Sequence, residues 1–416
     1  MSEQNEPRAN EPTGALSISA VTGLGAVDKA EWDGLANPGW RLSAGGRAER
    51  IDPAALPFNP FLTYDFLMCL EEAGCVGLRT GWQPRHLIVR DAVERAVAAA
   101  PAYLKSHSKG EYVFDYGWAD AFERAGGSYY PKLQVSVPFT PAQGPRLLVG
   151  TGAGAHERRA LLSRALVALA EQSNASSVHV TFTEADDHAA LTEAGYLARH
   201  DTQFHFLNRG YATPDDFLAA LASRKRKQIR RERRDALANG ITIRHVTGDD
   251  ITEADWDAFY AFYMDTGARK WGRPYLNRRF FSLIGERMAH AICLVMADRD
   301  GQPIAGALNM IGSETLFGRY WGCLEDHPFL HFEVCYYQAI DYAIAHGLAR
   351  VEAGAQGDHK LARGYEACQT RSAHFLRHPG LREAVEDYLV GERRAVERQN
   401  EVLNTYAPFK KTDGNG

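Results

Sequence analysis

Two parts of this chain repeat the same short patterns in the same order, and this repeat constrains the fold more than any other feature. Gly195-Tyr196 and His205-Phe206-Leu207 return as Gly364-Tyr365 and His374-Phe375-Leu376, each 169 positions later (364 − 195 and 374 − 205). Self-similarity at such a long period is typical of a duplicated folding unit. The repeat therefore predicts two similar folded bodies that share a cleft.

The offset between the two copies changes along the chain. Pro60-Phe61-Leu62 returns as Pro274-Tyr275-Leu276, 214 positions later (274 − 60). The difference of 45 positions (214 − 169) predicts an insertion of about that length in the first half, around Trp118 to Gly150. A chain of 416 residues is long enough for two large domains at roughly 150 residues each.

Both halves predict an antiparallel meander followed by a helix and one further strand. Asp300-Gly301 is a strong hairpin signal between two apolar runs of the second half. The elements expected there are strands at 290–298, 304–311 and 316–323, a helix at 333–346 and a strand at 349–353. The first half gives strands at 86–90, 98–104 and 112–115, a helix at 159–171 and a strand at 178–182. We expect two mixed α/β domains.

The repeat and the composition also set boundaries and exclude some classes of protein. The segments expected are a disordered tail at 1–15, a first domain at 16–208, a second domain at 209–390, and a C-terminal helix and tail at 391–416. A net charge of -5 gives no general attraction to nucleic acid or membrane. No run approaches the ~20 apolar residues of a membrane span, and the polar N-terminus lacks the apolar run of a secretory signal. We therefore expect a cytoplasmic protein, of unknown oligomeric state.

Three segments carry a resemblance to a known family. They are Lys105 to Asp115 (KSHSKGEYVFD), Tyr130-Pro131-Lys132, and Gly354 to Lys360 (GAQGDHK). These segments are similar to the FemAB-like bacterial proteins labelled peptidoglycan biosynthesis or recognition, and the predicted order of elements resembles the GNAT superfamily. The resemblance implies α/β architecture with two tandem GNAT-like (acyl-CoA N-acyltransferase) domains.

The resemblance also implies an activity. An acyl donor, either acetyl-CoA or an aminoacyl-tRNA, would lie in the cleft of a GNAT-like fold, and a primary amine of a small molecule or cell-wall precursor would attack its carbonyl carbon. Many GNAT enzymes hold the pyrophosphate of coenzyme A on a glycine-rich loop before the central helix. The corresponding loop here, Glu325 to Phe332, has no glycine and two acids. Gly150 to Ala155 is either a phosphate loop or a flexible linker.

Four residues are candidates for the chemistry. His359 titrates near neutrality and is the leading candidate for the base that takes the proton of the amine. Glu352 and Glu333 are alternative bases if burial raises their pKa. Tyr320, with Arg319 beside it, lies on the strand where GNAT enzymes polarise the acyl carbonyl, so it is a candidate hydrogen-bond donor to the oxyanion; a tyrosine filling the core explains it equally well.

Two groups of residues are candidates for holding an anionic donor. One is the loop after the last predicted strand, with Gly354, Gln356, Gly357 and Lys360. The other is the basic run at Arg224, Lys225, Arg226 and Lys227, on a predicted helix that would contact polyphosphate or the acceptor end of a tRNA. The alternatives are a tight turn and a solvated helix face. The six cysteines lack metal-ligand spacing, and no metal is expected.

Polar and aromatic residues alternate in the first half, as suits a partly apolar substrate. The candidate substrate-binding residues are Lys105, His107, Glu111, Asp115, Trp118, Asp120, Lys132 and, from the second half, Arg319. A half-buried sheet with a polar face explains any single one of them as well. Two other functions stay open: a noncatalytic protein that recognises its ligand in the same cleft, and a nucleic-acid-binding protein that uses the basic helix.

Overall fold

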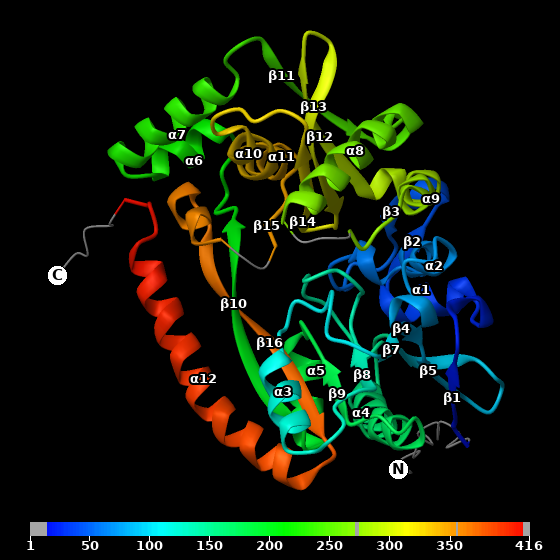
Figure 1. Ribbon diagram of the computed structural model, residues 1–416. Helices are drawn as coiled ribbons and strands as arrows, with labels where there is room; N and C mark the ends of the chain where they lie inside the picture. Colours follow the sequence, from blue (N-terminus) through cyan, green and yellow to red (C-terminus); the bar gives the residue numbers. More distant parts are fainter. Residues whose placement is uncertain (1–14, 271–273, 355–356, 411–416) are drawn as a thin grey trace, which may run out of the picture.

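The computed structural model describes residues 15–270, 274–354 and 357–410. Within these ranges, one mixed sheet of eleven strands runs through the molecule in the order β11-β12-β13-β14-β15-β10-β16-β9-β8-β7-β4 (Figure 1). Its strands are β4 (Trp82–Pro84), β7 (Ala102–Lys105), β8 (Lys132–Val135), β9 (Ser177–Val180), β10 (Leu197–Leu207), β11 (Ile241–Thr247), β12 (Ile292–Arg299), β13 (Gln302–Ile311), β14 (Thr315–Cys323), β15 (Arg350–Glu352) and β16 (Glu366–Leu376). A smaller sheet joins β1 (Ser17–Val21), β5 (His86–Arg90) and β6 (Ala96–Ala100).

Helices cover the sheets in both halves of the chain. The first half, through β10, has α1 (Lys29–Ala36), α2 (Tyr64–Glu72), α3 (Tyr116–Arg124), α4 (Ala155–Gln172) and α5 (Ala185–Glu193). The second half has α6 (Pro214–Ala220), α7 (Ser223–Ala236), α8 (Glu253–Lys270), α9 (Arg278–Met288), α10 (Leu330–Phe332), α11 (Gln338–Ala345) and α12 (Pro379–Thr405). A π-helical turn, Glu333–Tyr337, joins α10 to α11, and a 3₁₀ segment, Asp358–Arg363, precedes β16.

The two halves have the same strand order, as the repeat predicted. In each half the last strand of a meander (β8 or β14) pairs in parallel with the strand that follows a helix (β9 or β15). The next neighbour then comes from the other half: β16 lies beside β9, and β10 lies beside β15. The fold is therefore a mixed α/β structure of two tandem GNAT-like units.

The two units do not form separate sheets, because they exchange β10 and β16. These strands pair with each other in an antiparallel register in which Leu197 lies opposite His374 and His205 lies opposite Glu366. A shift of 169 positions converts one of these pairs into the other, so the register has the two-fold symmetry of the repeat. Because the units exchange strands, the domain boundary expected between residues 208 and 209 stays a prediction.

The repeat also explains the core between the units. Thr63 and Asn277, 214 positions apart, each cap a helix by accepting a hydrogen bond from the backbone N–H of Phe66 and Phe280 respectively. The rings of these two phenylalanines meet edge to face at 5.9 Å between α2 and α9. The same motif thus starts both helices and buries them against each other.

Two details of the first half differ from the sequence prediction. The strand expected at 112–115 is absent, because Tyr112 adopts a left-handed conformation (φ 61°) and Glu111 and Asp115 turn toward Lys132; β8 is the third meander strand instead. The strand expected at 98–104 is divided at Pro101, which has no N–H to donate. The inserted residues form two long connections, 106–131 and 136–154.

Candidate active site

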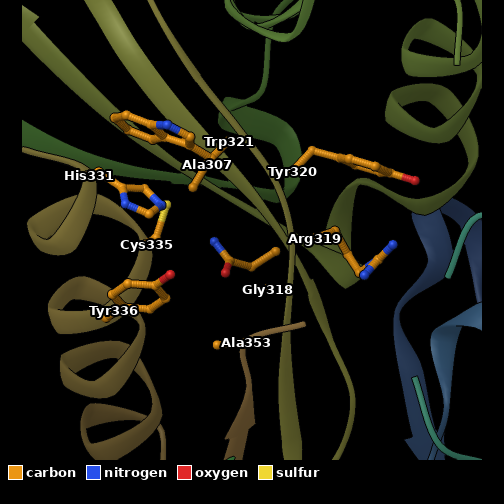
Figure 2. A pocket seen from close by; sticks show the side chains of 10 residues that line it. Ala307, Gly318, Arg319, Tyr320, Trp321, His331, Cys335, Tyr336 and Ala353 are labelled. Atoms are coloured by element: carbon orange, nitrogen blue, oxygen red, sulfur yellow. The ribbon is translucent and has the colours of Figure 1, made fainter. Parts of the chain in front are cut away.

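A cavity opens where the parallel strands β14 and β15 separate. The strands pair only from Thr315 to Phe317, opposite Arg350 to Glu352. Beyond that point lies a cavity of about 120 Å³. Its lining consists of residues from β13, β14, the end of β15 and the helix that starts at α10: Ala307, Asn309, Gly318, Arg319, Tyr320, Trp321, His331, Cys335, Tyr336 and Ala353 (Figure 2).

Irregular backbone on both walls makes room for this cavity. The pairing of β13 with β14 shifts between Leu308 and Asn309, so that Arg319 is the extra residue of a β-bulge. Opposite it, the π-helical turn Glu333–Tyr337 carries two lining residues, and such turns recur at functional sites. Gly318 leaves space at the centre, where a Cβ atom would lie 3.4 Å from Oδ1 of Asn309.

The lining side chains divide into two groups. Figure 2 shows Trp321, His331, Cys335 and Tyr336 gathered on one side, and Arg319 and Tyr320 pointing to the other. The Tyr320 hydroxyl donates a hydrogen bond to the Phe139 carbonyl at 3.0 Å, and the Arg319 guanidinium donates to the same oxygen. Phe139 belongs to the connection 136–154, so the first unit closes this side of the site.

Glu352 is a buried carboxylate at the end of β15, one residue before the lining residue Ala353, and the groups that lower its pKa are Arg350, the backbone of Gln143 and Arg146. It is 5% exposed, and burial raises its pKa to about 7. Within the described residues its Oε2 atom has no hydrogen-bond partner. The Glu352 carboxylate can therefore accept a proton near neutral pH.

His359 and Lys360 lie at the rim of the cavity. The Tyr336 hydroxyl and Nε2 of His359 are 3.0 Å apart, and the imidazole is exposed. Nζ of Lys360 donates a hydrogen bond to the Gly354 carbonyl at 3.0 Å, and burial lowers its pKa to about 8. Gly354 and Gly357 have φ of 80° and 115°, which favours glycine. Gln356 lies outside the described residues.

Glu333 is fully buried but is held by the basic helix α7. Its carboxylate accepts two hydrogen bonds from Arg233, at 2.9 and 3.2 Å, and one from Gln338 at 2.7 Å. Burial raises its pKa, and Arg233 opposes that shift. Neither Arg233 nor Gln338, the donors of these hydrogen bonds, lines the cavity.

The basic run forms helix α7, as the sequence predicted. Arg230, Arg233 and Arg234 make ion pairs with neighbouring acids. By contrast, four basic side chains at its N-terminal end make no ion pair with any described residue; Arg224 and Lys227 among them are exposed, and the other two are half-buried. These four are Arg224, Lys225, Arg226 and Lys227.

The first-unit candidates form a buried cluster of charges. Nζ of Lys132 donates a hydrogen bond to Glu111 at 2.7 Å and a shorter one to Asp115. Lys105 lies 3.6 Å from Glu111, and its Nζ atom sits 3.5 Å from the ring centroid of Trp82. Burial lowers the pKa of Lys105 to about 7. For Asp115, burial is the largest effect and raises the pKa, but the charges of Lys132 and His179 together with hydrogen bonds from Lys132 and Ser108 lower the pKa below its usual value.

The remaining first-unit candidates lie around or outside this cluster. Nδ1 of His107 is 3.4 Å from Nζ of Lys105. Trp118 stacks on His179, whose own pKa burial lowers to about 3. Asp120 is exposed on α3, where its one ion pair among the described residues is with Arg124. The structure thus brings together all of these candidates except Asp120.

The connection 136–154 fills the place in the first unit that corresponds to the cavity. Beyond the paired ends of β8 and β9, the fully buried Arg146 donates hydrogen bonds to the carbonyls of Thr181 at 2.9 Å and Ala142 at 2.6 Å. The N–H of Gly144 donates to the Phe182 carbonyl at 3.1 Å. In the first unit, residues of the connection 136–154 therefore occupy the place where the second unit has a cavity.

Comparison with known proteins agrees with this architecture. The model of the FemAB-like family, described as peptidoglycan biosynthesis/recognition, matches residues 23–411. This chain belongs to the FemAB-like family. No curated protein matches its sequence.

Among the solved structures that are similar to this FemAB-like protein, FemX shows the same fold. FemX has a TM-score of 0.52 at 12% identity, over 86% of this chain and 98% of FemX. L-PGS from Bacillus licheniformis has a TM-score of 0.46 at 9% identity, over 82% and 96% of the two chains. A tandem GNAT protein from the clavulanic acid pathway has a TM-score of 0.43 at 14% identity, over 88% and 99%.

Sequence reasoning missed several residues of this FemAB-like site. Asn309, Trp321, His331, Cys335 and Tyr336 line the cavity but belong to ordinary strand and helix patterns. The spacing of His331 and Cys335, one helical turn apart, was the signal available. Among the described residues, no three His, Cys, Asp or Glu side chains gather as a metal site, and no helix is long and apolar enough to cross a membrane.

Proposed function

We propose that this FemAB-like protein transfers an acyl group to a primary amine in the cavity between β14 and β15. The observation that carries the proposal is the separation of these parallel strands beside a bulge and a π-helical turn. The separation provides a cavity of about 120 Å³ in the second unit, whereas Arg146 fills the corresponding place in the first. One acyl group is then held per chain.

In this proposal the amine nitrogen attacks the carbonyl carbon of the donor from the side of the first unit. Glu352 takes the proton of the attacking amine, since it is buried beside Ala353 with an unpaired oxygen and a pKa of about 7. His359, linked to the cavity through Tyr336, is the alternative base. Backbone N–H groups at the bulge stabilise the oxyanion, because the Tyr320 hydroxyl already donates its hydrogen to the Phe139 carbonyl.

The donor is an acyl group on a polyanionic carrier, either acetyl-CoA or an aminoacyl-tRNA. The four cations of α7 that make no ion pair with a described residue support a polyphosphate contact, and Lys360 supports an anionic group at the rim. The loop 325–332 disfavours the pyrophosphate of coenzyme A, because it has no glycine and carries two acids, Glu325 and Asp326; this supports the aminoacyl-tRNA as donor.

The acceptor is a small amine of the kind found in cell-wall precursors. The buried cluster around Lys132 supports this by holding the segment 106–116, whose Phe114 and Tyr116 rings stack at 6.0 Å with about half of each residue exposed. Tyr112 in this segment lies under the guanidinium of Arg319, 5.9 Å from its ring centroid. The segment thus reaches from the charge cluster to the cavity.

The test is a turnover assay with both donor classes. The purified chain is incubated with acetyl-CoA or with a mixture of aminoacyl-tRNAs, and with a panel of amines that includes amino-sugar and peptide acceptors. We expect an amide product, detected by mass spectrometry, with one donor class and no product from a Gly318→Trp variant that fills the cavity. Binding of donor or amine without any product would instead support a noncatalytic recognition protein.

A further inference from the structure

Arg319 lies in the wall of the cavity on the side of the first unit. It is the extra residue of the bulge on β14, beyond the last residues of that strand that pair with β15. Its side chain is half-buried and lines the cavity. Figure 2 shows it pointing, with Tyr320, away from the wall that carries Trp321 and His331. A molecule that enters the cavity from the first unit therefore meets this guanidinium.

The charge of Arg319 is not neutralised by the part of the chain that the structure describes. Two other arginines of the second unit with little exposure each have an acid partner: Arg233 pairs with Glu333 at 2.9 Å, and Arg363 pairs with Glu232 at 3.0 Å. Arg319 forms no ion pair with any described residue, and its guanidinium donates a hydrogen bond to an uncharged backbone carbonyl. A partly buried cation without a counter-ion favours the binding of an anion.

Two tyrosine rings flank the guanidinium of Arg319. Its Cζ atom lies 5.0 Å from the ring centroid of Tyr320 and 5.9 Å from that of Tyr112. Contact with ring faces leaves the N–H groups in the guanidinium plane for hydrogen bonds. The buried Nε atom has no hydrogen-bond partner among the described residues. Since a buried donor without an acceptor lowers stability, packing alone does not explain an arginine at this position.

The connection 136–154 does not depend on Arg319 for its attachment to the second unit. The Phe139 carbonyl that accepts from Arg319 also accepts a hydrogen bond from the Tyr320 hydroxyl at 3.0 Å. The Phe139 ring stacks on Tyr275 with 4.8 Å between the ring centroids and meets Trp82 at 5.2 Å. These contacts hold Phe139 in place, so a purely structural role leaves the charge of Arg319 unexplained.

From these observations we propose that Arg319 binds a carboxylate of the acceptor, so that the substrate of the cavity carries both an amine and a carboxylate. This inference rests on the proposed acyl transfer and names the chemical class of its acceptor. A planar guanidinium can donate two parallel hydrogen bonds to one carboxylate. The guanidinium lies at the end of its side chain, away from Gly318 at the strand gap. The amine and the carboxylate of the acceptor are therefore several bonds apart, as in an ω-amino acid or a short peptide.

The first test needs no turnover. The probes are 6-aminohexanoate and 6-aminohexanamide, which share the amine and the carbon chain and differ in the carboxylate. The full chain is treated with phenylglyoxal, an arginine-selective reagent, and peptide mass spectrometry follows the modification of Arg319. We expect 6-aminohexanoate, in excess over its dissociation constant, to slow this modification at least about fivefold. The carboxamide should not slow it, and the exposed Arg164 on α4 should react equally in all samples.

The second test measures amide formation from the same two probes. We expect the parent chain to use 6-aminohexanoate with a kcat/KM about 10- to 100-fold above that of the carboxamide, because hydrogen bonds to a charged group are strong. Arg319→Gln should remove this preference. Arg319→Lys should keep part of it, since the charge remains but the two parallel hydrogen bonds do not. Arg164→Gln is the matched control and should keep the parental preference.

The outcomes separate this inference from the proposed function. Equal use of both probes by the parent chain would overturn the carboxylate subsite and leave acyl transfer standing. A loss of the same size for both probes in Arg319→Gln would show that the side chain acts only through the structure, which also overturns the subsite. Modification of Arg319 that neither probe slows would do the same. Protection by 6-aminohexanoate alone, without amide product from any donor, would support the subsite and count against acyl transfer.

Discussion

The Nδ1 atoms of His179 and His374 lie 2.7 Å apart, and the two residues come from opposite halves of the chain. They face each other on the paired strands β9 and β16, both buried, beside Trp118. One ring must donate and the other accept, so the contact requires at least one neutral imidazole. Protonation of both rings would therefore break this contact at the junction between the units.

The first prediction concerns acid stability. Burial lowers the pKa of His179 to about 3 and that of His374 well below 6.5, so the folded state binds fewer protons than the unfolded state between about pH 6.5 and 3. Stability should therefore fall as pH drops through this window, by a few kcal/mol. Urea unfolding of a His179→Gln/His374→Gln variant should show a flatter pH dependence, and the exposed His156→Gln should keep the parental slope.

A second prediction concerns the buried charge cluster. Lys132→Met leaves Glu111 and Asp115 without their main cation, so it should lower the free energy of unfolding by about 3–5 kcal/mol. The exposed Lys109→Met is the matched control and should change it by less than about 0.5 kcal/mol. A loss under about 1 kcal/mol at Lys132 would mean that the carboxylates find other partners.

A third prediction addresses Glu352 as the base. Since its pKa is about 7, turnover at saturating substrate should rise with pH up to about 7 and then level off. Glu352→Gln should lower turnover by roughly 10²–10⁴-fold, while the exposed Glu314→Gln should not. An unchanged pH profile in Glu352→Gln would exclude this carboxylate and favour His359.

The fourth prediction separates His359 from Lys360. Lys360→Ala should raise the donor Michaelis constant and leave turnover largely intact if the ammonium holds an anionic group. His359→Ala should lower turnover by about 10²–10⁴-fold with nearly the parental donor affinity if the imidazole is the base. Steady-state kinetics of both variants decide the matter, and full activity in both would reduce this segment to a turn.

The fifth prediction tests helix α7. Replacing Arg224, Lys225, Arg226 and Lys227 by glutamine should weaken the use of a polyanionic donor more at low salt than at high salt, because phosphate contacts depend on counterion release. The exposed pair Arg394 and Arg398 on α12 is the control, and its replacement by glutamine should leave the salt dependence unchanged. Parental donor affinity at every salt concentration would identify a solvated helix face.

The repeat made the fold predictable from sequence. The repeated motifs lie just before the capped starts of α2 and α9 and in the strands β10 and β16. The exchange of those strands was not predictable, because a strand pattern specifies which residues face the core and not which neighbour it pairs with. The strand expected at 112–115 failed for a related reason: alternating polar and aromatic residues also suit a connection held by buried ion pairs.

The candidate site was only partly predictable. Arg319 and Tyr320, which line the cavity, were candidates because the resemblance points to their strand, and Glu352, outside the lining, was an alternative base. His331 and Cys335 were not candidates, since their place in the lining depends on a π-helical turn and on a bulge at Arg319 that have no signature in a single sequence. Arg146 was missed because its buried position requires the whole connection 136–154 to fold into the first unit.

The exchanged strands also govern how the chain is made. When the ribosome has released the first half, β9 still lacks the neighbour that residues 366–376 will supply, so its edge stays open while roughly half of the protein is synthesised. Stable closure of either unit therefore waits for the C-terminal end of the chain. A truncation before β16 should remove both units at once, and the nascent first half should depend on chaperones that cover exposed strand edges.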